Sequence, residues 1–157
     1  MPSQQAQQLQ EFADEIFEMS KEIWAAQTRA KTKEQPELTE TEFLALDILH
    51  KAGQSQTVGE IQRTIGILPA QMSRVIRSLE SKSDEPLIAC RINPTDKRKV
   101  DVELTPTGRK AHAGYRQMKL GHILAMLESL ETTDRQEFIR ILRLIRHKTN
   151  QAKELQD

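Results

Sequence analysis

Apolar residues near the amino terminus recur at alternating intervals of three and four positions. This spacing places them on one stripe of a long helix, as in helices that pack side by side. Such a stripe can pack inside one chain, but a long helix that precedes the domain it serves more often packs against a partner chain. We therefore predict a dimerisation helix with a seam formed by Leu9, Phe12, Ile16, Met19, Ile23 and Ala26.

Two threonines and a proline mark the starts of three shorter helices. Thr39 and Thr57 are each followed three residues later by glutamate, the capping-box arrangement that satisfies free amides of a first helical turn. Gly66 marks the end of the second helix, and Pro69 begins the third, since its missing N–H costs nothing in a first turn. The apolar residues that follow Thr39 are spread around their helix, which predicts a buried support for a helix-turn-helix.

The helix that begins at Pro69 is predicted to bury Met72, Val75, Ile76 and Leu79. At about 100° per residue, the opposite side is small, polar and cationic. Such a face suits DNA, because small residues let the backbone approach a groove and arginine can hold guanine with two bonds. An ordinary solvated face explains this helix alone equally well. The outward residues are Ala70, Gln71, Ser73, Arg74, Arg77, Ser78 and Ser81.

A two-stranded ribbon is predicted after this helix. Residues 100–104 alternate valine or leucine with aspartate or glutamate, as in a half-buried strand, and the run from Leu87 to Ile92 can pair with it. The turn between them ends in three consecutive cations, Lys97, Arg98 and Lys99. An extended tip with a long guanidinium suits the narrow minor groove, and Asp96 is awkward there unless it holds Arg98 in position.

The ribbon also carries a family resemblance. Residues 96–108 read Asp96-Lys97-Arg98-Lys99-Val100-Asp101-Val102-Glu103-Leu104-Thr105-Pro106-Thr107-Gly108. This run resembles the wing signature of the MarR family of bacterial regulators, D-x-R-x-x-x-V-x-L-T-x-x-G, and residues 72–80 are similar to that family's recognition helix. The resemblance implies a homodimeric winged-helix repressor or activator, with the recognition helix in the major groove and Arg98 in the minor groove. One departure is the longer turn from Ser81 to Pro86, which leaves the tilt of the wing open.

The charge distribution agrees with a DNA reader. The chain has no formal net charge, but residues 51–119 hold thirteen lysines and arginines against seven aspartates and glutamates, a net +6. Residues 1–28 carry one cation against five carboxylates, so the predicted dimerisation helix should stay away from DNA. The expected phosphate contacts are Arg63, Arg74, Arg77, Lys97 and Lys99.

Two further helices are predicted after the ribbon. Thr105-Pro106 opens a long helix, and Thr132 or Thr133 caps a last one. The fold class is therefore mainly α with a small β-wing. It divides into a dimerisation helix over residues 1–36, with a polar connection from Thr28, a winged helix-turn-helix over 37–108, and dimerisation helices over 109–157. The expected dimer contacts are Leu9, Phe12, Ile16, Met19, Phe138, Ile141, Leu142 and Ile145.

Catalytic and metal motifs give little support to an enzyme. The four histidines are widely separated, and no paired cysteines or glycine-rich phosphate loop is present. Asp47 and His50 are predicted to pair with each other rather than to bind a metal, and no cofactor is expected. The single Cys90 is interpreted as a small buried hydrophobe. With no apolar run of membrane-spanning length, the cytoplasm is the default location.

We therefore interpret the sequence as a ligand-responsive transcriptional regulator that binds a palindromic operator as a homodimer. In the resembled family, small and often phenolic effectors bind between the dimer body and the reader. Candidate effector contacts are bulky, polar-tipped residues on helices that should meet: Trp24, His50, His112 and Tyr115. The alternatives are a winged helix used for protein contacts without specific DNA binding, and an enzyme subunit.

Overall fold

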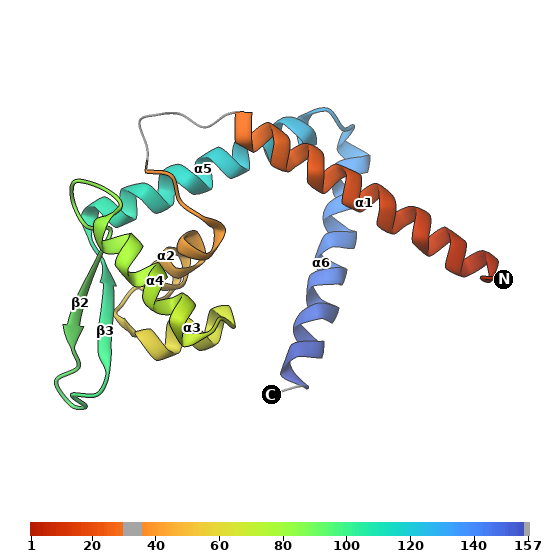
Figure 1. The fold of residues 1–157 in the computed structure, drawn as a ribbon. Coiled ribbons are helices and arrows are strands. Elements are labelled where there is room, and N and C mark those ends of the chain that lie inside the picture. Colours follow the sequence, from red (N-terminus) through yellow and green to blue (C-terminus); the bar gives the residue numbers. More distant parts are fainter. Residues whose placement is uncertain (30–35, 156–157) are drawn as a thin grey trace. The chain divides into compact units, whose positions relative to one another are not determined.

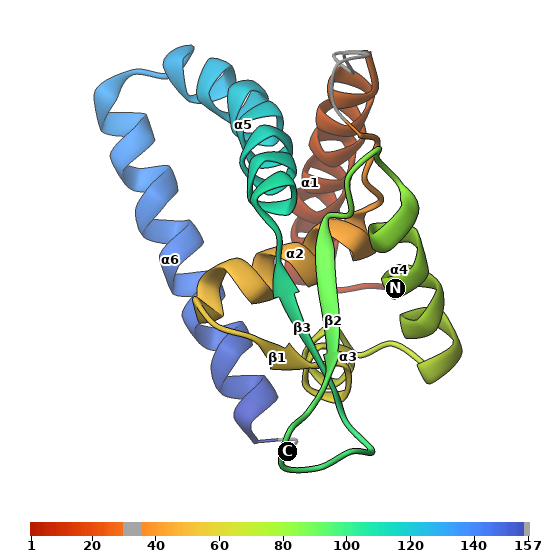
Figure 2. The ribbon, with the colours of Figure 1, turned by 90° about the vertical axis from the view of Figure 1, so that its left-hand side faces the viewer.

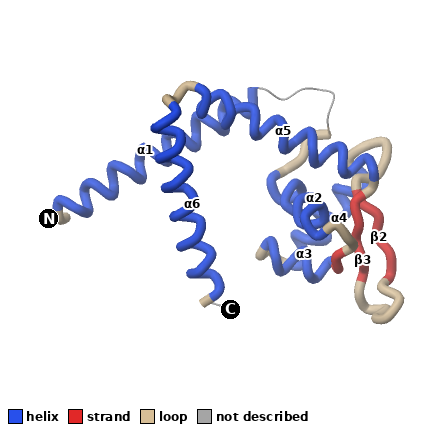
Figure 3. Tube along the Cα trace, turned by 180° about the vertical axis from the view of Figure 1, so that it is seen from behind, coloured by secondary structure: helices blue, strands red, loops and turns tan. Residues whose placement is uncertain are grey.

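The computed structural model describes residues 1–29 and 36–155 and shows a mainly helical chain with one small sheet (Figures 1 and 3). Residues 30–35 of the predicted connection, and residues 156–157, lie outside the described part. The elements are α1 (Gln4–Arg29), α2 (Glu40–Ala52), β1 (Gln56–Thr57), α3 (Val58–Ile65), α4 (Pro69–Ser81), β2 (Ile88–Ile92), β3 (Val100–Leu104), α5 (Pro106–Glu128) and α6 (Thr132–Glu154). They form two compact units: a winged-helix unit, Thr28–Lys119, and a helical unit, Met1–Gln27 with Leu120–Asp157.

The predicted caps of α2 and α3 are confirmed. Thr39 and Thr57 each accept a hydrogen bond from the backbone of the glutamate three residues on, and that glutamate accepts one from the threonine amide. Gly66 ends α3 with φ of 80°, a left-handed conformation that favours glycine. The chain then passes directly into α4 at Pro69, so α3 and α4 form the predicted helix-turn-helix.

The sheet has the antiparallel order β1-β3-β2 (Figure 2). β2 pairs with β3 along its whole length, from Ile88 opposite Leu104 to Ile92 opposite Val100. β1 was not predicted; its two residues, Gln56 and Thr57, pair with Val102 and Asp101. A strand of two residues is too short to show an alternating pattern, so the sequence does not indicate it.

The core of the winged-helix unit lies where α2, α3 and α4 meet the sheet. α2 packs against α3, α4 and β3, which confirms its predicted role as the support of the helix-turn-helix. The largest side chains with almost no exposure are Leu46, Ile61, Met72, Leu79, Leu87, Ile88 and Val102. The predicted inward alternation of β3 holds at Val102, but Val100 is 36% exposed because the core ends before this part of the ribbon.

A buried carboxylate joins the start of α2 to the end of α4. Glu42 is 5% exposed and forms an ion pair with Lys82; its side chain also accepts hydrogen bonds from the Ser78 hydroxyl (2.9 Å) and the Thr39 amide (3.1 Å). Lys82 in turn donates to the carbonyl oxygen of Glu37 at 2.7 Å. Glu42 therefore has partners for both carboxylate oxygens, and it fixes α4 against α2.

Replacing Lys82 with methionine should lower the free energy of unfolding by about 2 kcal/mol, because it keeps the aliphatic stem but leaves Glu42 buried without its cation. The matched control is Lys21→Met, which breaks the exposed pair between Lys21 and Glu18 and should change stability by less than about 0.5 kcal/mol. Urea unfolding at a fixed protein concentration compares the two. Equal effects would mean that burial does not strengthen the Glu42 pair.

The helical unit leaves its apolar residues open in the single chain. Leu9, Phe12 and Ile16 are between 57% and 62% exposed, and α6 contributes no buried residue although Ile145 and its neighbours are apolar. The predicted threonine cap of α6 is wrong: the cap residue is Glu131, and its side chain makes no capping hydrogen bond. None of the helices within 1–29 and 36–155 combines the length and apolarity needed to cross a membrane.

Candidate nucleic-acid interface

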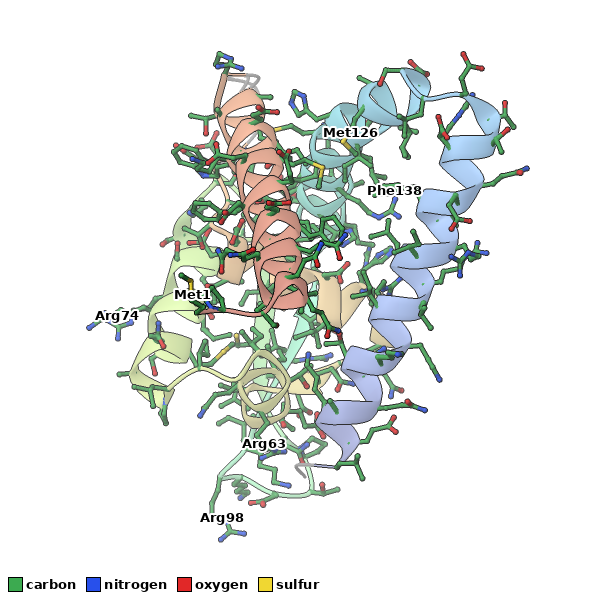
Figure 4. All side chains as sticks on the ribbon, turned by 90° about the vertical axis from the view of Figure 1, so that its right-hand side faces the viewer. Met1, Arg63, Arg74, Arg98, Met126 and Phe138 are labelled. Atoms are coloured by element: carbon green, nitrogen blue, oxygen red, sulfur yellow. The ribbon has the colours of Figure 1, made fainter. Side chains whose placement is uncertain are left out.

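The outward face of α4 is exposed as its sequence predicts. Its exposed members are Ala70, Gln71, Ser73, Arg74, Arg77 and Ser81. Ser78 is the correction: it is half-buried, and its hydroxyl donates to Glu42. Position 78 lies at the border between the two faces, where α2 covers it, so Ser78 serves the packing of α4. Figure 4 shows Arg74 projecting away from α4 and Arg98 projecting from the wing.

The amino-terminal end of α4 is open. Its cap residue, Leu68, is 70% exposed and has no side-chain acceptor for the helix amides, and the Gln71 side chain accepts a hydrogen bond only from the Leu68 amide, at 3.4 Å. The first backbone hydrogen bond of the helix runs from the Met72 amide to the Leu68 carbonyl oxygen, so the preceding amides of Ala70 and Gln71 have no acceptor within the helix. Free amides and the helix dipole together favour an anion such as a phosphate.

The wing consists of β2, β3 and the turn of residues 93–99, and Asn93 organises this turn. Its side-chain oxygen accepts hydrogen bonds from the amides of Thr95 (3.0 Å) and Asp96 (2.9 Å), and its amide group donates to Asp101 at 2.9 Å. The backbone closes the turn with a bond from the Asn93 amide to the Lys99 carbonyl oxygen. The tip therefore has a defined shape.

Asp96 holds Arg98, the arrangement that the sequence required of this carboxylate. Oδ1 of Asp96 accepts hydrogen bonds from the backbone amide and Nε of Arg98, both at 3.1 Å, and Oδ2 accepts from the guanidinium at 3.2 Å. Hydrogen bonds from the Arg98 side chain and backbone hold the pKa of Asp96 below its usual value. The Arg98 side chain is nevertheless 90% exposed, so it is oriented but still available to a partner.

The other carboxylates of the wing also have partners. Glu103 pairs with Arg91 across the two strands at 2.9 Å, and Asp101 accepts from Asn93. Lys97 and Lys99 are exposed beside Arg98. The tip therefore presents a local excess of positive charge, which matches the negative potential of a nucleic acid groove.

The longer turn from Ser81 to Pro86 is tied down at the base of the wing. The Thr105 hydroxyl donates to the carbonyl oxygen of Pro86 at 2.6 Å and accepts from the Gly108 amide at 2.9 Å. The Thr107 hydroxyl donates to Glu85 at 2.6 Å. The turn is thus fixed to the first residues of α5, and the extra length does not leave the wing unsupported.

Three of the four candidate effector contacts are near one another. His112 is 2% exposed, and its ring stacks on those of His50 (4.3 Å between centroids) and Phe43 (5.1 Å). Tyr115 stacks on Phe43 with 4.5 Å between ring centroids, so Phe43 lies between Tyr115 and His112; Phe43 is not among the candidates that the sequence indicates. Trp24, the fourth candidate, belongs to the helical unit and is 64% exposed.

The partner predicted for Asp47 is wrong. Asp47 pairs with Nε2 of His112 at 2.9 Å and with Lys51 at 2.7 Å, whereas His50 only stacks on His112. Burial opposes ionisation of Asp47, but the hydrogen bonds from Lys51 and His112 hold its pKa below the usual value. Asp47 and His112 are 65 positions apart, so no short sequence motif indicates this pairing of α2 with α5.

Cys90 lies half-buried in β2. Burial and the neighbouring Glu80 raise the pKa of its thiol to about 12. A thiol that stays protonated at neutral pH is a poor nucleophile, which agrees with its interpretation as a small apolar residue rather than a redox sensor.

Comparison with known proteins gives the same fold. The model of the MarR family matches residues 38–100, whereas no curated protein matches the sequence. The structure is similar to YusO from Bacillus subtilis, with a TM-score of 0.74 at 20% identity, covering 93% of this chain and 99% of that one.

Two further solved structures are similar. A mutant of MepR from S. aureus, bound to an oligodeoxyribonucleotide, has a TM-score of 0.62 at 18% identity over 88% of this chain and 97% of its own. BpsR from Bordetella bronchiseptica, whose DNA binding is regulated by 6-hydroxynicotinic acid, has a TM-score of 0.63 at 21% identity over 86% and 98%. At these identities the likeness establishes a mainly helical winged-helix fold.

Proposed function

Because the MarR family model matches residues 38–100, we propose that this chain is a winged helix-turn-helix transcriptional regulator of that family and that it binds duplex DNA as a homodimer. The observation that carries the proposal is the exposed guanidinium of Arg98, held by Asp96 at the tip of the wing. An arginine that is both oriented and solvent-exposed is prepared for a partner, since little side-chain freedom remains to be lost on binding.

In the proposed complex, α4 lies in the major groove and the wing reaches the minor groove. Arg74 and Arg77 face base edges or phosphates, and Arg98 enters the minor groove. Lys97, Lys99 and Arg63 contact phosphates, and the free amides at the start of α4 add a further phosphate site. This arrangement uses the positive charge that residues 51–119 concentrate in an otherwise neutral chain.

The second copy is proposed to cover the apolar residues of α1 and α6. A monomer would leave these side chains in water, and large exposed apolar areas are typical of interfaces. The proposed contacts are Leu9, Phe12, Ile16, Met19, Phe138, Ile141, Leu142 and Ile145; of these, Met19 and Phe138 are already half-buried in the single chain. Two-fold symmetry then places two copies of α4 about one helical turn of DNA apart, roughly 34 Å, and requires an imperfect palindrome as operator.

We also propose that a small aromatic effector regulates DNA binding. The regulation of BpsR by 6-hydroxynicotinic acid supports this class of ligand. Within this chain, the exposed His50 and the half-buried Tyr115, at the two ends of the stacked cluster, are the rings proposed to contact such a molecule, with Phe43 and the buried His112 stacked between them. An effector can change DNA affinity only through its different affinity for the DNA-binding and non-binding arrangements of the dimer.

The test begins with selection of bound fragments from the source genome, followed by fluorescence anisotropy on the enriched site. We expect particles of twice the 18.0 kDa chain mass and a log–log dependence of affinity on salt with a slope of roughly −5 to −9, since each protomer offers about five phosphate contacts. No enrichment, with affinity that does not change with salt, would instead favour a protein-contact module.

A further inference from the structure

An apolar pair lies exposed on the wing. Ile92 and Val100 are directly opposite each other on β2 and β3, and they are 67% and 36% exposed. Side chains alternate along a strand, so this pair lies on the same face of the ribbon as Ile88 and Val102, which are each 1% exposed. The apolar face of the ribbon that packs against the core therefore extends past the core. In that part, none of the described residues covers it.

The charges around this pair identify the chemistry of its partner. Lys97 and Lys99 are exposed in the turn that joins the two strands, and Arg98 projects from the same tip (Figure 4). The carboxylates of the wing are already engaged, Asp96 with Arg98 and Glu103 with Arg91. An apolar pair within a positively charged wing tip fits a partner that is strongly anionic and presents C–H groups close to its charges.

We propose that Ile92 and Val100 pack against the deoxyribose walls of the minor groove on either side of the proposed Arg98 contact. Val100 begins β3 two residues after Arg98, which lies in the turn of residues 93–99, and the minor groove is about 7.5 Å deep. With the Arg98 guanidinium at the groove floor, the apolar pair reaches the rim, where the sugars present their C–H groups. This inference rests on the proposed function, to which it adds a contact that is independent of phosphate charge.

Salt dependence separates this contact from those of the cations. Cation–phosphate contacts set the slope of log affinity against log salt, whereas apolar contacts change the affinity at every salt concentration without changing the slope. The double variant Ile92→Thr/Val100→Thr keeps two β-branched residues, which suit a strand, but replaces apolar groups by hydroxyls. The matched control Ile92→Val/Val100→Ile exchanges the two residues and keeps their total apolar volume.

Fluorescence anisotropy on the selected operator is expected to show affinity for the threonine variant reduced about tenfold with an unchanged slope, and affinity for the exchange variant within about twofold of the native protein. Hydroxyl-radical footprinting should show weaker protection of minor-groove sugars with the threonine variant only. Native affinity in the threonine variant would overturn the inference, as would a slope reduced by about one unit or more per protomer.

Two controls keep the result interpretable. Thermal unfolding checks that the double variant folds; if its melting temperature falls, the single variant Ile92→Thr at the more exposed position replaces it under the same criteria. A native protein that shows no salt-dependent affinity for DNA would refute the proposed function and the contact together, whereas native binding that is unaffected by the threonines would refute the contact alone.

Discussion

Replacing Gly108 with alanine is expected to lower the free energy of unfolding by about 3 kcal/mol or more. A Cβ atom at this position would lie 1.9 Å from the carbonyl oxygen of Leu87 and 2.9 Å from its carbonyl carbon, both backbone atoms that cannot rotate away. The same Leu87 carbonyl accepts a hydrogen bond from the Thr105 amide. Relief of the clash would therefore separate the start of α5 from the base of the wing.

The control for this variant lies on the same helix. Gly121→Ala adds a methyl group with no atom within 4 Å and should raise stability by roughly 0.5 kcal/mol, because alanine is the better helix former. Thermal unfolding at equal protein concentration should show a melting temperature lower by roughly 10 °C for Gly108→Ala and unchanged or slightly higher for Gly121→Ala. Similar behaviour of the two variants would mean that α5 moves freely at Gly108.

Gly108 is also the last residue of the run that resembles the MarR wing signature, and the structure gives that position a physical reason. The run links the tip, where Asp96 orients Arg98, to a base where Thr105 bonds to Pro86 and only glycine fits beside Leu87. The spacing of this run therefore indicates both the wing tip that is proposed to bind DNA and the base of the wing that supports it. This is why a short motif predicted the wing well although the turn before it is unusual.

Local signals predicted most of the fold. The caps at Thr39 and Thr57, the glycine after α3 and the proline at the start of α4 each depend on residues within one helical turn. The sequence around each position is therefore sufficient to predict them. The cap of α6 was misplaced because Thr132 and Thr133 are good capping residues, yet Glu131 is the residue with extended backbone at the helix start. Propensity alone does not decide such a boundary.

Distant pairings escaped sequence reasoning. Asp47 has a histidine three residues away on its own helix, but it bonds instead to His112 on α5, because that ring is buried against α2. Ser78 lies near the outward face of α4 but bonds to Glu42, 36 positions away. Both errors arose from assigning a polar residue to its nearest sequence neighbour or to solvent, when tertiary packing supplied a buried partner.

For the proposed DNA complex, the Arg98→Ala variant is expected to lose roughly 30-fold or more in operator affinity. The slope of log affinity against log salt should decrease in magnitude by about two per dimer, one for each lost cation. The matched control is Arg91→Ala, which removes an equal charge from the same wing; Arg91 pairs with Glu103 on the strands, outside the turn of residues 93–99, and has no assigned DNA contact, so its loss should change affinity by less than about threefold.

The effect of Arg98→Ala should also be independent of pH near neutrality. Hydrogen bonds from Arg98 hold the pKa of Asp96 below its usual value of 3.8, so the carboxylate is ionised at any higher pH and the pair is lost only as the pH falls through that lowered pKa. Anisotropy titrations at about pH 6 and about pH 8 should therefore give the same ratio of native to variant affinity. An Arg98→Ala protein with native affinity and native salt slope would place the wing tip outside the DNA interface, and α4 would then have to account for binding without it.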